Sequence, residues 1–151
     1  MTQAIERETV LKRINGIQGE LADLQRLAQL PLVTFSSGDG YKLAQYHLHR
    51  ALEGVFNITG HILARIPGAQ ATQYKEMARK LGEVGIVDRT FADTTLTEMA
   101  KYRNRLVHFY SEVTSDELYS LLQNDLGDFH TFLQAVKDVL TDPVRFGLTV
   151  E

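Results

Sequence analysis

The strongest constraint on the fold is an apolar repeat that advances by alternating steps of four and three residues. Near the beginning of the chain this repeat comprises Val10, Ile14, Ile17, Leu21, Leu24 and Ala28. Because an α-helix turns once every 3.6 residues, such spacing places apolar side chains along one face of a helix. The pattern predicts a helix over residues 10–28, which ends before Pro31 and must bury that face against other elements.

The same repeat predicts two more long helices. The first covers residues 48–66 and stops at Pro67-Gly68, and its stripe is Leu48, Leu52, Val55, Thr59, Ile62 and Ile66. The second opens with the capping-box sequence of residues 114–117, Thr-Ser-Asp-Glu, and stops at Asp142-Pro143. Its stripe is Leu118, Leu122, Leu126, Phe129, Leu133, Val136 and Leu140.

Two further helices are predicted over residues 74–84 and 94–108, and a loop over residues 36–39. No stretch shows the two-residue alternation that is typical of a strand. The fold class is therefore all-α, an up-and-down bundle of four to five helices.

A second face of the helix over residues 48–66 and its upstream extension carries small residues. Ala44, Ala51 and Gly54 share this face with His47 and Ile58. Small side chains let another helix approach closely, so two accounts stay open at this point. The face packs inside the bundle, or it forms the seam of a dimer.

Length and composition place the protein in a broad class. With 151 residues the chain fits one domain, 1–151, whose tail over residues 144–151 is expected to be extended and mobile. Cysteine is absent, which excludes disulfides and thiolate zinc sites. We find no signal-peptide core and no membrane-spanning run, so a cytoplasmic protein is expected. A net charge of −3 argues against a general nucleic-acid coat but allows a local basic site.

Chemistry is concentrated in residues 101–110, Lys-Tyr-Arg-Asn-Arg-Leu-Val-His-Phe-Tyr. On a helix, Arg103, Asn104, His108 and Tyr110 fall on one broad arc, with Tyr110 nearly in line with Arg103. Asn104 and His108 are four residues apart and can touch. The arc is wide, however, so Arg103 and His108 converge better if the helix ends near His108, or across a dimer interface.

These side chains suit the cleavage of a phosphodiester. Histidine transfers protons near neutral pH, and arginine offers a charged fork that matches phosphate oxygens. RNA supplies its own nucleophile, the 2′-hydroxyl, so no metal and no other cofactor is needed. His47 and His49 diverge by about 200° on a helix and cannot hold one metal ion, so no metal site is expected.

The string R-N-x-x-V-H-x-Y, which begins at Arg103, resembles the R-x(4–6)-H motif of HEPN nucleases in its HepT form, R-x(4)-H-x-Y. It contains the only R-x(4)-H in the chain. The resemblance implies a HEPN-like fold and a two-fold dimer with composite sites. It implies a metal-independent endoribonuclease toxin with RNA as substrate, Arg103 and His108 as catalytic residues, and Asn104 in support. It also implies an antitoxin of the MNT type, a nucleotidyltransferase that AMPylates Tyr110.

Other positive side chains are candidate RNA contacts, namely Arg50, Lys101 and Arg105. Each motif residue also has a purely structural interpretation. Arg103 would pair with a glutamate of a neighbouring helix, and His108 would cap a helix C-terminus. Tyr110 would be a core residue, and Asn104 an exposed helix residue.

Two other functions compete with the nuclease. One is a non-catalytic HEPN module that docks a nucleotidyltransferase or binds nucleotides. The other is a general helical adaptor, which would pack His108 away from solvent.

Overall fold

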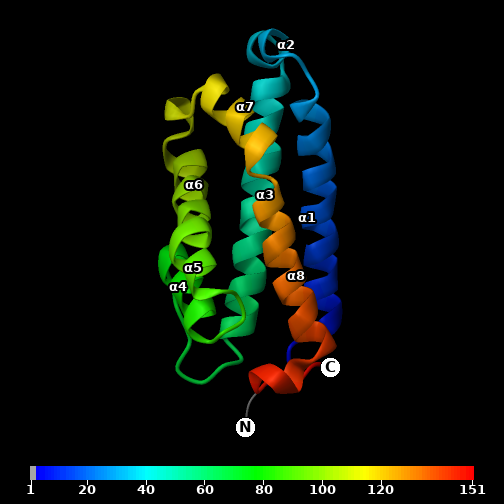
Figure 1. Ribbon diagram of the computed structural model, residues 1–151, viewed down its shortest axis with the longest axis vertical. Coiled ribbons are helices and arrows are strands. Elements are labelled where there is room, and N and C mark those ends of the chain that lie inside the picture. Colours follow the sequence, from blue (N-terminus) through cyan, green and yellow to red (C-terminus); the bar gives the residue numbers. More distant parts are fainter. Residues whose placement is uncertain (1–2) are drawn as a thin grey trace.

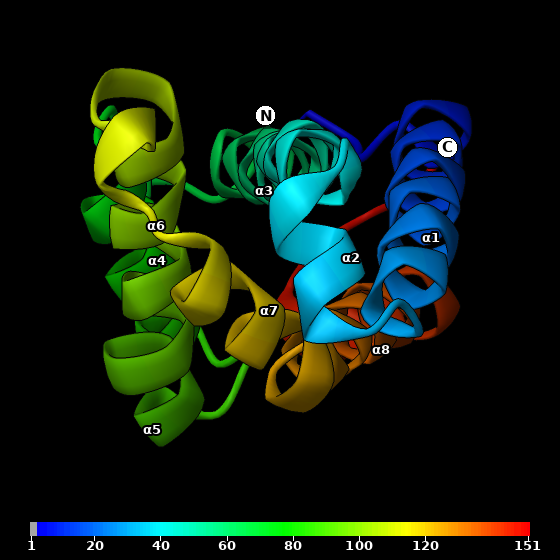
Figure 2. The ribbon, with the colours of Figure 1, turned by 90° about the horizontal axis from the view of Figure 1, so that it is seen from above.

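Three long helices, α1 (Arg7–Ala28), α3 (Gly40–Leu63) and α8 (Gly127–Thr141), lie side by side along the long axis of the molecule (Figures 1 and 2). The computed structural model describes residues 3–151. The apolar stripe predicted for the first helix is buried along its whole length. The stripe of α3 is buried from Leu48 to Ile62, and the helix ends at Leu63, before Ile66.

A second group of helices covers the opposite side of α3 (Figure 2). It contains α4 (Tyr74–Glu83), α5 (Arg89–Phe91) and α6 (Thr97–His108), with a π-helical segment, η1 (Ala92–Leu96), between the last two. The predicted helix over residues 94–108 therefore begins earlier, at Arg89. Asp88 caps this start, because its carboxylate accepts hydrogen bonds from the backbone N–H groups of Thr90 and Phe91.

The helix predicted over residues 115–141 is two helices, α7 (Ser115–Asn124) and α8, so that prediction is wrong. The break falls at Asp125 and Leu126, while the apolar stripe stays buried on both sides of it. Thr114 caps α7 as predicted, since its hydroxyl accepts from the backbone N–H of Glu117 at 3.1 Å.

A short helix, α2 (Leu32–Ser37), precedes α3, so the loop predicted over residues 36–39 is wrong at residues 36 and 37. Its Phe35 is fully buried and packs against the rings of Tyr41 and Tyr119. One aromatic side chain thus holds this segment across the end of the bundle.

The small-residue face of α3 packs inside the molecule. A Cβ atom added to Gly54 would lie 2.6 Å from Cγ1 of Ile17 in α1, so only glycine allows this close approach. Ala44, Ala51 and Ile58 are fully buried. This settles the open alternative for this face in favour of internal packing.

The C-terminal residues are anchored to the start of the chain. After the 3-10 helix η3 (Pro143–Phe146), Leu148 is buried and Val150 forms a parallel bridge with Ile5. Backbone N–H groups of Ile5 and Glu151 donate to the carbonyls of Thr149 and Ile5, at 2.8 and 2.9 Å. Residues 144–146 thus lie in η3, and the last residues of the tail are held to the start of the chain by these hydrogen bonds.

The described residues contain no strand longer than this single bridge, so the all-α prediction is confirmed. None of their helices combines the length and the apolar character that crossing a membrane requires.

Candidate active site

The motif residues lie on α6 and in the turn that follows it. Arg103, Asn104 and His108 belong to the helix, and His108 is its last residue. Phe109 leaves the helical conformation with φ −135° and ψ 36°, and Tyr110 opens the 3-10 helix η2 (Tyr110–Glu112). The expectation that Tyr110 continues the helix in line with Arg103 is therefore wrong, because the helix ends two residues earlier.

Arg103 is held by contacts from three sides. Its Nε donates to Oε1 of Glu53 on α3 at 2.5 Å, and its Nη1 donates to Oδ1 of Asn104 at 3.2 Å. Its guanidinium carbon lies 4.5 Å from the centre of the Tyr74 ring on α4. The pairing with a glutamate of a neighbouring helix is thus real, but it uses only one of the five N–H donors of the guanidinium.

Glu53 is the centre of this arrangement, and sequence reasoning missed it. The hydroxyl of Tyr74 donates to Oε2 of Glu53 at 3.2 Å, and Nε2 of His49 lies 3.4 Å from Oε1. Burial and then the charge of Glu53 raise the pKa of Tyr74, so the phenol stays a neutral donor. The only available signal was a carboxylate one helical turn after His49, within an otherwise apolar segment.

A cleft of about 440 Å³ opens beside Arg103. Residues from the start of α4 and the middle of α6 line it: Thr72, Gln73, Tyr74, Lys75, Arg103 and Asn104. We call it the donor cleft, because its polar side chains offer amides, hydroxyls and cations but no carboxylate. This chemistry favours an anionic ligand.

His108 is exposed to solvent at the end of α6. Within the described residues its ring has no hydrogen-bond partner, and it lies 6.4 Å from the Phe109 ring, centre to centre. Its exposure disfavours the helical adaptor. Because His108 is five residues after Arg103, the two lie about 7.5 Å apart along the axis and point about 140° apart. Within one protomer the helix does not bring them together.

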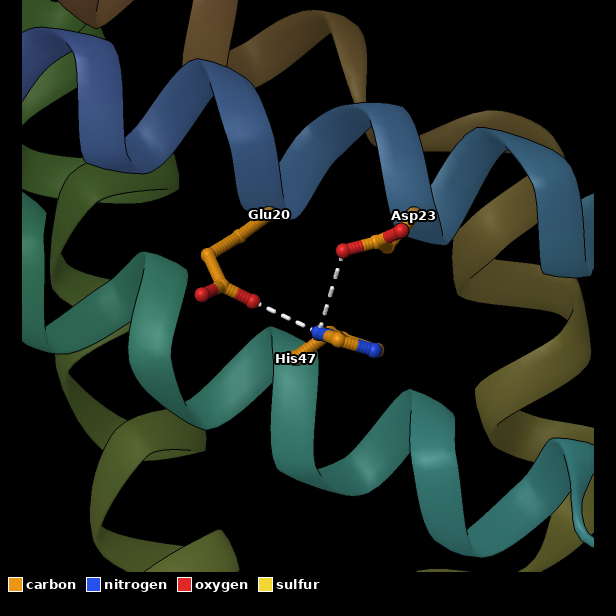
Figure 3. A group of neighbouring side chains, drawn as sticks. All are labelled: Glu20, Asp23 and His47. Atoms are coloured by element: carbon orange, nitrogen blue, oxygen red, sulfur yellow. Dashed lines mark hydrogen bonds and ion pairs between the residues drawn. The ribbon is translucent and has the colours of Figure 1, made fainter.

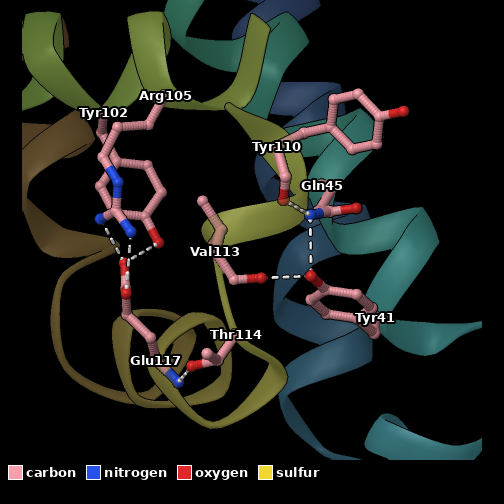
Figure 4. Close-up of polar contacts among 8 residues, drawn as sticks. All are labelled: Tyr41, Gln45, Tyr102, Arg105, Tyr110, Val113, Thr114 and Glu117. Carbon is pink, nitrogen blue, oxygen red and sulfur yellow. Dashed lines mark hydrogen bonds and ion pairs between the residues drawn. The ribbon is translucent and has the colours of Figure 1, made fainter. Parts of the chain in front are cut away.

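The turn after His108 is fixed by α3 (Figure 4). Nε2 of Gln45 donates to the carbonyl of Tyr110 at 3.0 Å and lies 3.1 Å from the hydroxyl of Tyr41, which in turn donates to the carbonyl of Val113. The Tyr110 ring points away from this network and is 61% exposed. The interpretation of Tyr110 as a core residue is therefore excluded.

Each of the three candidate RNA contacts has a carboxylate partner. Arg105 binds Glu117 through two hydrogen bonds, of 2.6 and 3.1 Å, and this contact lowers the pKa of Glu117 (Figure 4). Lys101 pairs with Glu98 at 3.1 Å, and Arg50 pairs with Glu20 at 2.8 Å.

His47 and His49 point to different neighbours, in agreement with their predicted divergence. Nδ1 of His47 lies 2.6 Å from Glu20 and 3.7 Å from Asp23 on α1 (Figure 3), whereas His49 faces Glu53. Glu20 is shared with Arg50. The Glu20, Asp23 and His47 group thus joins α1 to α3 through one hydrogen bond, from His47 to Glu20, and a longer polar contact to Asp23.

Comparisons with known proteins show the family and the fold of this chain. The family described as "Ribonuclease HepT-like" matches residues 17–136. A solved structure of a tri-AMPylated HEPN toxin from Shewanella oneidensis, in complex with an MNT antitoxin, is similar with a TM-score of 0.77. The two sequences are 21% identical over 85% of this chain and 96% of that chain. No curated protein matches in sequence.

The family match contains both α3, with Glu53, and the whole motif of residues 103–110, and the likeness to the solved structure shows the HEPN toxin fold. The chain therefore belongs to the HepT-like ribonuclease family.

Proposed function

We propose that this protein is the toxin of a HEPN/MNT toxin–antitoxin system and acts as a metal-independent endoribonuclease. The observation that carries the proposal is how the side chains of Arg103 and His108 are placed. Arg103 is oriented beside a cleft without carboxylates, and His108 is open to solvent on the same helix. The Arg103–Glu53 pair joins α6 to α3, whereas His108 makes no hydrogen bond or ion pair within residues 3–151.

In the proposed reaction His108 removes the proton from the RNA 2′-hydroxyl, and the 2′-oxygen attacks the adjacent phosphorus. Arg103 stabilises the extra negative charge of the five-coordinate phosphorane. The bond to the 5′-oxygen then breaks, and that oxygen takes up a proton. The products are a 2′,3′-cyclic phosphate and a 5′-hydroxyl.

A two-fold dimer would complete the site, because one protomer leaves Arg103 and His108 apart. Exposed aromatic residues lie at the end of α6 and on the adjacent part of α3, namely Tyr46, Phe109 and Tyr110. Their burial between two copies would bring the motif of one protomer to that of its partner in an isologous contact.

The test of the proposal is the incubation of purified protein with RNA in excess chelator. We expect cleavage at the same rate with and without chelator, and fragments that end in 2′,3′-cyclic phosphate. Light scattering on the same sample is expected to give the mass of two chains. Intact RNA under all conditions would favour the alternative, a non-catalytic HEPN module that docks a nucleotidyltransferase or binds nucleotides.

Tyr110 is proposed as the point of control by an MNT-type nucleotidyltransferase. Support comes from its exposed hydroxyl two residues after His108 and from the similar HEPN toxin, which is tri-AMPylated and in complex with an MNT antitoxin. Each AMP would add a negative charge and bulk next to the motif, and thereby compete with RNA.

Co-production with the partner nucleotidyltransferase is expected to add multiples of about 329 Da, the mass of an AMP residue, to the peptide that contains Tyr110 and to abolish RNA cleavage. Tyr46 is a matched control, since it is exposed to a similar degree, 54%. Tyr46→Phe should still be modified, and Tyr110→Phe should not. Full neutralisation of Tyr110→Phe by the partner would show that inhibition works through binding alone.

A further inference from the structure

Two hollows of opposite chemistry adjoin α6. On one side lies the donor cleft. The other is a groove of about 560 Å³ against α3, α7 and α8, with an apolar floor that includes Leu48, Leu52 and Phe129. Its charged lining is entirely acidic: Glu98, Glu117, Asp125 and Asp128. Of the two, only the donor cleft has cations and no carboxylate in its lining, and the nearby carboxylate of Glu53 is paired with Arg103.

The contacts of Arg103 determine which of its donors face a ligand. Nε is engaged by Glu53 and Nη1 by Asn104, while Nη2 has no hydrogen-bond partner within residues 3–151. The guanidinium lies over the Tyr74 ring, which is itself stacked on Phe56 at 4.9 Å with an angle of 8° between the rings. The arginine is thus fixed on a rigid aromatic support with one donor edge left open.

Lys75 is the second cation of the donor cleft. It is exposed, and in the part of the chain that the structure describes it makes no ion pair. By contrast, Lys80 on the same helix pairs with Glu83 at 3.4 Å. Lys75 therefore contributes an uncompensated positive charge at the mouth of the cleft, next to the amide of Gln73.

We propose that the donor cleft binds the RNA phosphate that flanks the cleaved bond, with Lys75 and Gln73 as its contacts. The inference rests on the proposed nuclease function. Asn104 lines the cleft and is one turn before His108 on the same face of α6, so an RNA strand that reaches His108 can continue into the cleft. Lys75 is then a binding residue that the HEPN motif does not include.

The test uses the full-length protein and an RNA oligonucleotide that carries 2′-O-methyl groups, which bind but cannot be cleaved. Lys75→Ala is expected to weaken binding about 10-fold at low salt, the loss of one charge-assisted contact. The slope of log Kd against log salt should fall by about one, because one phosphate contact is lost. With cleavable RNA the loss should appear in KM rather than in kcat.

Lys80→Ala is the matched control, because it removes a lysine about 140° away on the same helix. It should bind the oligonucleotide like the wild type, and Lys75→Arg should restore most of the affinity. Unchanged affinity of Lys75→Ala, or an equal loss in Lys80→Ala, would overturn the proposal. A protein that cuts no RNA yet loses affinity through Lys75→Ala would refute the nuclease function and leave the phosphate site standing.

Discussion

Replacement of His108 by alanine is expected to slow RNA cleavage by about 10²–10⁴-fold, the usual contribution of a general base. The imidazole is exposed and makes no hydrogen bond within the described residues, so its removal leaves no buried group unsatisfied. The thermal unfolding of His108→Ala should therefore match that of the wild type. Initial rates on a labelled oligonucleotide, measured beside a melting curve, separate a chemical loss from a folding loss.

His130 on α8 provides the control for this experiment, because it is equally exposed and lies outside the motif. His130→Ala should cleave RNA at the wild-type rate. If His108→Ala cleaves as fast as the wild type, the histidine is not the base and the proposed mechanism fails.

The second large effect is expected at Glu53. Glu53→Ala should lower kcat by about 10²-fold, because Arg103 loses the partner that fixes its Nε, and misplacement by about 1 Å costs about that much. Glu53→Gln keeps an acceptor for Nε and should lose less. RNA affinity, measured with the uncleavable oligonucleotide, should change little, since Glu53 does not line the donor cleft. Glu53 is thus a positioning residue that acts through Arg103.

A double-mutant cycle distinguishes this role from a general loss of stability. If Glu53 acts only through Arg103, the double variant Glu53→Ala, Arg103→Ala should be no slower than Arg103→Ala. Glu98→Ala is the control, because it breaks an exposed ion pair with Lys101 on the same helix and leaves the Arg103–Glu53 pair intact. Additive losses in the double variant would contradict the positioning role.

The apolar repeat predicted the helices well, because the side chains that a helix buries along one face recur in the sequence with the period of the helix. It could not reveal the break between α7 and α8, since Leu126 keeps the period of the stripe across the break. Nor could it reveal η1, because the π-helical segment buries Ala92 and Leu96 as an α-helix of that composition would. Periodicity reports which side is buried, and backbone hydrogen bonds decide where an element stops.

Some residues of the candidate site could also be predicted from the sequence, and others could not. Arg103 and His108 follow from a local motif, whereas Glu53 is 50 residues away from Arg103 in sequence and meets it only because α3 and α6 pack together. The packing of α3 against α1 likewise explains Gly54, whose role depends on the side chain of Ile17. The conformation of Tyr110 depends on Gln45, another long-range partner. Contacts between residues that are far apart in the chain cannot be predicted from a single sequence.

The bridge between Ile5 and Val150 has a practical consequence for handling the molecule. Because the bridge is parallel, a linker has to run back along it, so about a dozen residues are needed to join residue 151 to residue 3. A circular permutant with its new ends in the connection between α4 and α5 should therefore fold. The bridge also lies at the opposite end of the bundle from η2 (Figure 1). A fluorophore or a surface tether attached near residues 5 or 150 would leave the neighbourhood of Tyr110 unobstructed, which suits the protein to immobilised single-molecule measurements.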